Sequence, residues 1–118
     1  MARKVRPLDS DWLRAYPLPV PDNVADKNSR GRVLAIGGCT TVPGGIQLTA
    51  EAALRAGAGK IQVATVASAA LALGIAMPEV VVFALPEAGA GESALRSARP
   101  LSGLLERRDA VVALSLIH

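Results

Sequence analysis

A glycine-rich segment, residues 37–45 with the sequence GGCTTVPGG, holds the residue types and spacing most suited to chemistry. It follows a short apolar run, residues 33–36, and precedes a stretch with helical periodicity, so it joins a buried strand to a helix N-terminus. The N–H groups and the dipole at such a terminus favour anions, and glycine lets a ligand approach the backbone closely. Glycines that serve only a tight strand-to-helix turn are the alternative, and these residues leave it open.

The common phosphate-binding motifs do not match this segment. A dinucleotide fingerprint needs G-x-G-x-x-G, and residues 37–39 (GGC) break that spacing, whereas a Walker A loop needs a lysine where residues 44–46 read GGI. We therefore expect any phosphate to be held through backbone groups, with contacts from Gly38 and Thr40. Lys27 precedes the first strand and is a third candidate phosphate contact, although a solvated turn lysine is the more usual role.

Few other side chains could do chemistry. His118 is the single histidine and the last residue, and no Cys, His and carboxylate cluster has metal-ligand spacing, so we predict no metal site. Cys39 has no histidine near it in sequence and is interpreted as a small filler residue. Glu51 and Glu79 are isolated carboxylates, and no general acid/base pair is visible. From these residues alone the prediction stops at a ligand-binding α/β domain.

Composition limits the class of protein. The chain has 118 residues, of which 51% are hydrophobic and 19% charged, so it is one small domain or part of a larger one. The net charge of +3 comes with few aromatics beside the basic N-terminus, so we expect no nucleic-acid partner. The longest apolar stretch, residues 67–77, is too short to span a bilayer, so we expect no membrane partner. The single cysteine favours a cytoplasmic location.

Strands and helices alternate around the glycine-rich segment. We expect strands at 33–36, 61–66, 80–85 and 109–114, and helices at 43–57, 67–75 and 93–108, the last interrupted at Pro100. This order predicts an α/β fold, a parallel sheet with right-handed crossovers and helices on both faces. Residues 1–26 are predicted to be a proline-rich N-terminal arm that lies over the domain, with one helical turn capped near Asp9. Residues 27–118 are predicted to belong to the α/β domain.

Three segments together resemble the ADP/ATP-dependent NAD(P)H-hydrate dehydratases, which belong to the ribokinase-like superfamily. Residues 27–38, KNSRGRVLAIGG, are similar to the family's opening lysine, Gly-Arg, hydrophobic run and Gly-Gly. Residues 52–59, AALRAGAG, resemble the family's helix end at every position, and Pro78-Glu79 precedes a hydrophobic strand as in the family. The resemblance extends from about Lys27 to Val112, and the combination is more specific than any single glycine loop.

The resemblance implies a ribokinase-like fold, here truncated after about four strands, and a metabolite-repair enzyme. Members are carbon–oxygen lyases that remove water from hydrated NADH or NADPH with ADP or ATP as cofactor, and Mg²⁺ is compatible with that chemistry. The family's loop after the first strand lines the hydrate pocket, which corresponds here to Pro43, Gly44 and Gly45. The resemblance also implies NAD(P)H-hydrate epimerase as a functional partner and a homo-oligomeric full-length parent.

Two family motifs are missing from the chain. Leu114-Ser115-Leu116 stands where the family has Gly-Pro-Gly, and the Gly-Thr-Gly-Asp motif with the presumed catalytic aspartate is expected beyond residue 118. We therefore assign no catalytic residue, interpret residues 27–118 as the N-terminal part of a dehydratase domain, and expect this fragment to be inactive alone. A ribokinase-like small-molecule kinase and a non-catalytic binding module are the alternative functions.

Overall fold

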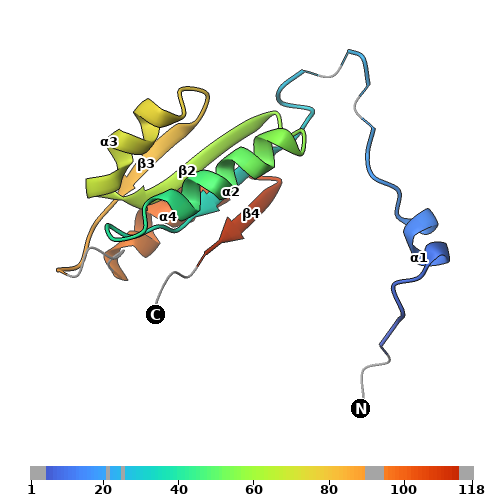
Figure 1. Ribbon diagram of the computed structural model, residues 1–118, viewed down its shortest axis with the longest axis horizontal. Coiled ribbons are helices and arrows are strands. Elements are labelled where there is room, and N and C mark those ends of the chain that lie inside the picture. Colours follow the sequence, from blue (N-terminus) through green and yellow to red (C-terminus); the bar gives the residue numbers. More distant parts are fainter. Residues whose placement is uncertain (1–4, 21, 25, 90–94, 115–118) are drawn as a thin grey trace.

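The computed structural model describes residues 5–20, 22–24, 26–89 and 95–114, and these form a four-stranded parallel sheet with helices on both faces (Figure 1). The strands are β1 (Arg32–Ile36), β2 (Lys60–Val66), β3 (Val81–Leu85) and β4 (Ala110–Ala113), in the spatial order β3-β2-β1-β4. β1 pairs in parallel with both β2 and β4, and β2 pairs in parallel with β3. The α/β architecture expected from the sequence is confirmed.

Helices cover both faces of this sheet in the described ranges. α2 (Gly44–Arg55) and α3 (Ala67–Ala76) lie on one face, and α4 (Ala98–Leu105) lies on the other after a 3₁₀ turn, η1 (Leu95–Ser97). The handedness of crossovers explains this division. The units β1–α2–β2 and β2–α3–β3 step along the sheet in one direction, whereas β3–α4–β4 steps back across it, so right-handed crossovers place α4 on the opposite face.

Two hydrophobic cores follow from the alternation of side chains along the central strands. The core under α2 and α3 contains Ala35, Ile46, Ala50, Ile61, Val63, Leu73, Met77 and Val80. The core under α4 contains Leu34, Ala64 and Leu85, against which Leu101 and Leu104 pack. β1 and β2 therefore bury apolar side chains on both faces, as expected for central strands of a parallel sheet.

Two prolines differ from their expected positions. Pro100 does not interrupt a helix but is the third residue of α4, in the first turn, where an N–H has no intrahelical partner to lose. α4 ends at Leu105 rather than at residue 108, and residues 93 and 94 lie outside the described residues. Pro43 stands at the N-cap of α2, one residue before the first turn, with φ −72°.

The N-terminal arm contains the expected short helix, α1 (Ser10–Ala15), capped by the Asp9 side chain, which accepts from the Trp12 N–H at 2.9 Å. The first part of the arm does not lie over the domain, however: Figure 1 shows α1 standing away from the sheet. The end of the arm does approach the domain, because Pro19, Val20, Asp22 and Val24 line a cavity together with residues of α2 and β4. Leu18 and Val20 are 88% and 90% exposed. Proline-punctuated backbone is extended and stiff, but the prolines do not set the direction in which the arm leaves the sheet. No helix in the described ranges has the length and apolar character needed to cross a bilayer.

Candidate functional site

The glycine-rich segment leaves the carboxyl end of β1, the sheet edge at which open α/β folds bind ligands. The Gly37 N–H donates to the Ala64 carbonyl at 3.1 Å, which extends the β1–β2 pairing by one residue. Gly38 has φ +90°, and a Cβ there would lie 2.6 Å from Thr65 Oγ1. A Cβ on Gly37 would lie 2.9 Å from the Leu114 carbonyl oxygen. Close packing therefore requires glycine at both positions, whether or not a ligand binds.

The end of the same segment is open. A Cβ on Gly44, the first residue of α2, would meet nothing within 4 Å. Pro43 at the N-cap supplies no side-chain hydrogen bond to the first turn, because its ring has no acceptor. The positive end of the α2 dipole therefore faces open space at Gly44, an arrangement that suits a phosphate or another anionic group.

The N-terminus of α3 lies at the same edge, but a side chain of the protein already caps it. The Ser68 N–H donates to Glu87 Oε1 in a short hydrogen bond. Hydrogen bonds from Ser68, first from its side chain and second from its backbone, lower the pKa of Glu87 below its usual value. The carboxylate thus caps α3 and complements its dipole. Of the two helices on this face, α3 has a protein anion at its N-terminus and the α2 N-cap provides none.

The predicted site residues divide between the two ends of the sheet. Pro43, Gly44 and Gly45 lie at the carboxyl edge together with Gly38 and Thr40, whose Oγ1 is 3.0 Å from Ser68 Oγ. The amino edge holds Lys27, because its carbonyl oxygen packs against Gly59, just before β2 begins. A five-residue strand separates the two edges by about 15 Å. The structure therefore brings the five loop residues together and leaves Lys27 apart.

Sequence patterns alone did not point to three polar residues that lie at the carboxyl edge. Thr65 is near the end of β2, Ser68 is in the first turn of α3, and Glu87 follows β3 by two residues. The signal that could have found them is their position after the ends of neighbouring parallel strands, which meet at one edge of the sheet. The type of a residue alone does not show that it follows the end of a strand.

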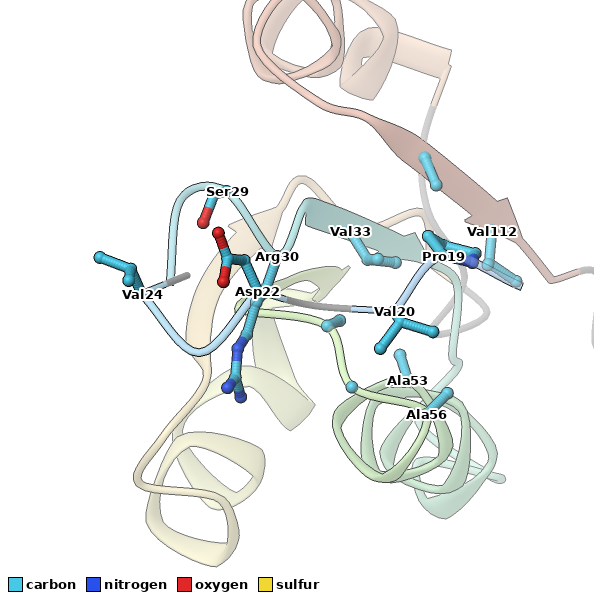
Figure 2. A pocket seen from close by; sticks show the side chains of 13 residues that line it. Pro19, Val20, Asp22, Val24, Ser29, Arg30, Val33, Ala53, Ala56 and Val112 are labelled. Atoms are coloured by element: carbon cyan, nitrogen blue, oxygen red, sulfur yellow. The ribbon is translucent and has the colours of Figure 1, made fainter. Parts of the chain in front are cut away.

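A cavity of about 820 Å³ lies elsewhere, between the arm, α2 and β4 (Figure 2). It is lined by Pro19, Val20, Asp22, Val24, Ser29, Arg30, Val33, Ala53, Ala56, Gly57, Ala58, Ala110 and Val112. Most of these side chains are small and aliphatic, and none is a predicted site residue. The cavity lies toward the starts of β1 and β4 and the end of α2, away from the glycine-rich segment.

A metal site of three or more His, Cys, Asp or Glu side chains is absent from the part of the chain that the structure describes. The carboxyl edge instead offers backbone N–H groups, hydroxyls and one carboxylate already engaged by α3. Such a set of groups can bind and orient an anionic ligand. It contains no pair of groups arranged for general acid/base chemistry.

The fold places the chain in a known class. Its structure is similar to that of a ribokinase-like superfamily protein from Enterococcus faecalis V583, with a TM-score of 0.62 and 24% sequence identity. The match covers 82% of this chain and 32% of that protein. At this identity the likeness establishes the fold, which is ribokinase-like as the sequence resemblance implied.

The family follows from the sequence comparisons. The family model described as NAD(P)H-hydrate dehydratase matches residues 33–113, and the chain belongs to that family. It is 50% identical over 109 residues to an ADP-dependent (S)-NAD(P)H-hydrate dehydratase from Xanthomonas campestris pv. campestris, covering 92% of this chain and 37% of the relative. It is 37% identical over 111 residues to a bifunctional NAD(P)H-hydrate repair enzyme, Nnr, from Moorella thermoacetica, covering 94% of this chain and 20% of that protein. The chain thus spans little more than a third of the first relative.

Proposed function

We propose that this chain belongs to an enzyme that repairs hydrated NADH or NADPH by nucleotide-dependent dehydration. Family membership and the identity to a dehydratase named ADP-dependent support this reaction class. The structural observation that carries the proposal is the open N-terminus of α2 at Gly44, beside a loop that packs too closely for any residue but glycine at position 38. A dinucleotide substrate supplies the anionic phosphates that such a terminus accommodates.

In this proposal the loop holds the substrate through its backbone. Pro43, Gly44 and Gly45 line the hydrate pocket, and Gly38 and Thr40 approach a phosphate or ribose oxygen. A contact from Lys27 would have to serve a different group, because Lys27 lies at the other end of the sheet. These residues bind and orient the substrate, and none of them is proposed to transfer a proton.

ADP or ATP is the proposed energy source, as the name of the Xanthomonas relative supports. The described residues offer no cluster that fits Mg²⁺, so no step here depends on that ion. The printed sequence contains no Gly-Thr-Gly-Asp motif, so we assign neither the nucleotide phosphates nor the catalytic carboxylate to its residues. We propose NAD(P)H-hydrate epimerase as the functional partner, which the bifunctional relative from Moorella thermoacetica supports. We also propose that the whole protein is a homo-oligomer and that it works in the cytoplasm.

Equilibrium binding of hydrated NADPH tests the proposed substrate loop. Gly44→Asp would place a carboxylate at the start of α2 and is expected to weaken binding about tenfold or more, because it competes with the ligand for the helix N-terminus. Gly103→Asp is the matched control, since it adds the same charge where a Cβ also meets nothing within 4 Å, on α4. Equal affinity of both variants would contradict the proposed site.

Turnover distinguishes binding from catalysis. The chain as printed is expected to bind hydrated NADPH without restoring the near-ultraviolet absorbance of NADPH when ADP or ATP is added. The Xanthomonas relative, assayed in parallel, is the positive control. Recovery of absorbance by the printed chain would show that a catalytic group lies within its own residues, and would contradict the assignment made here.

A further inference from the structure

Thr65 carries a buried hydroxyl that has no hydrogen-bond partner among the described residues. Its side chain is 0% exposed near the carboxyl end of β2, and Oγ1 is unpaired. Other hydroxyls on the strands and helices nearby are paired: Thr49 Oγ1 donates to the Gly45 carbonyl, and Ser97 Oγ donates to the Pro86 carbonyl, both at 3.2 Å. A buried hydroxyl without a partner reduces the stability of a fold, so it needs an explanation.

Valine would fill the same space without that loss. Val63 and Val66 are fully buried in the same strand, and valine has the branched shape of threonine. The hydroxyl of Thr65 is therefore the one part of the side chain that packing does not require. Departures of this kind from local stability concentrate at functional positions.

The hydroxyl lies under the loop that is proposed to hold the substrate. A Cβ on Gly38 would lie 2.6 Å from Thr65 Oγ1 and 3.3 Å from Cγ2 of Ile46, which is in the first turn of α2. Thr65 Oγ1 and the Ile46 side chain in the first turn of α2 therefore both lie next to Gly38. Gly37 and Gly38 both lack a Cβ and both have positive φ, so the peptide between them has access to conformations that other residues rarely adopt.

We propose that Thr65 is a positioning residue for the ligand-bound form of this loop. When the Gly37–Gly38 peptide rotates to turn the Gly38 N–H toward a phosphate or ribose oxygen, the Gly37 carbonyl turns toward the sheet and accepts the Thr65 hydroxyl. The hydroxyl then gains the partner that it lacks among the described residues. This inference rests on the proposed function, because it takes hydrated NAD(P)H as the ligand of the loop.

The test compares Thr65→Val with Thr65→Ser. Thr65→Val is expected to bind hydrated NADPH about three- to tenfold more weakly, the effect of one lost hydrogen bond. Its thermal midpoint without ligand should equal or exceed that of the wild type, because the unpaired hydroxyl is removed. Thr65→Ser keeps the hydroxyl and should keep the wild-type affinity, although it loses a buried methyl group.

Ser97→Ala is the control for the sign of the stability change, since it removes a buried hydroxyl that already donates to the Pro86 carbonyl. It should lower the thermal midpoint, whereas Thr65→Val should not. A midpoint lowered equally by both variants, or unchanged affinity in Thr65→Val, would overturn the role of Thr65 while leaving the proposed function standing. Absence of hydrate binding by the wild-type chain is a different result, which overturns the proposed function and this inference with it.

Discussion

The hydroxyl of Thr40 lies 3.0 Å from the hydroxyl of Ser68 and forms a hydrogen bond between two segments that are 28 residues apart. Thr40 belongs to the loop after β1, and Ser68 belongs to the first turn of α3. Ser68 also donates its N–H to Glu87, which follows β3. One residue therefore joins the segments that follow three neighbouring strands, and it couples the proposed substrate loop to a helix on the same face.

Ser68→Ala tests that coupling. The substitution removes the hydroxyl that bonds Thr40 and also interacts with the Glu87 carboxylate, and it keeps the backbone N–H that Glu87 accepts. We expect the free energy of unfolding to fall by about 0.5–1.5 kcal/mol, toward the lower end because the bond is exposed. Urea denaturation measures the change, with Ser102→Ala, a hydroxyl bonded within α4, as the control. If both variants unfold alike, the Thr40–Ser68 bond does not join the segments in solution.

Glu87 makes stability depend on pH. The Ser68 hydrogen bonds lower the pKa of Glu87 in the folded state. Its contribution to the free energy of unfolding is therefore complete above the unfolded-state pKa of about 4.5, and it is lost as the pH falls through the folded-state pKa. Glu87→Gln should remove the part of the pH dependence that lies below about pH 4.5. Asp26, whose pKa is also lowered, by hydrogen bonds from Ser29 and Asn28, titrates in an overlapping range and is present in both proteins.

Unfolding free energy measured from pH 6 to pH 3 tests this prediction. The wild type should lose more stability than Glu87→Gln over that interval, and hydrogen exchange at the Ser68 amide should quicken in the wild type first. Parallel curves for the two proteins would show that Glu87 does not cap α3 in solution.

Two glycines of one loop should respond in opposite ways to alanine. Gly38→Ala places a Cβ 2.6 Å from Thr65 Oγ1 at φ +90°, so we expect a loss of about 1–3 kcal/mol. Gly44→Ala meets open space at the start of α2 and should stabilise the protein by about 0.4–1 kcal/mol, because alanine restricts the unfolded chain. Thermal denaturation of the two variants measures both changes in stability. A similar loss in both would mean that the first turn of α2 is not in the conformation described.

The exposed edges of the sheet predict that the 118-residue chain associates with itself. β4 is an edge strand of the described sheet, and its Val111 and Val112 are 44% and 38% exposed. Unpaired strand edges with apolar side chains promote association between copies. Val111→Lys should shift the protein toward monomer in sedimentation velocity, whereas Arg99→Lys on α4 should not. A monomeric wild type with a sharp, reversible melt would contradict this prediction.

Local signals predicted the fold well because they act along the chain. The apolar run at residues 33–36 and the glycines after it marked β1 and the turn to α2, and the β-α alternation implied parallel pairing. The role of Pro100 was misjudged because a proline looks the same in a first turn as in a break, and only the start of the helix distinguishes the two. The course of the arm depended on what its side chains contact, which its prolines do not reveal.

The candidate site was predictable only in part, for a reason of geometry. A backbone feature such as Gly38 leaves a trace in the sequence, because few residues other than glycine fit there. Ser68 and Glu87 leave none, because they are 19 residues apart and meet only when β2 and β3 pair. Lys27 precedes the same strand that Gly38 follows, so its distance from the loop was implicit in the strand direction but not in the residue types.

The spatial order β3-β2-β1-β4 also bears on how the protein folds. Each pairing up to β3 joins strands that are consecutive in the chain, whereas β4 must return across the sheet to reach β1. Contacts that close long stretches of chain form slowly, because their entropy is lost before the contact is gained. Within the described sheet, β1, β2 and β3 can therefore assemble with α2 and α3 before β4 arrives. The bond from the Arg32 N–H to Asp109, at 2.7 Å, forms only when β4 has returned to β1.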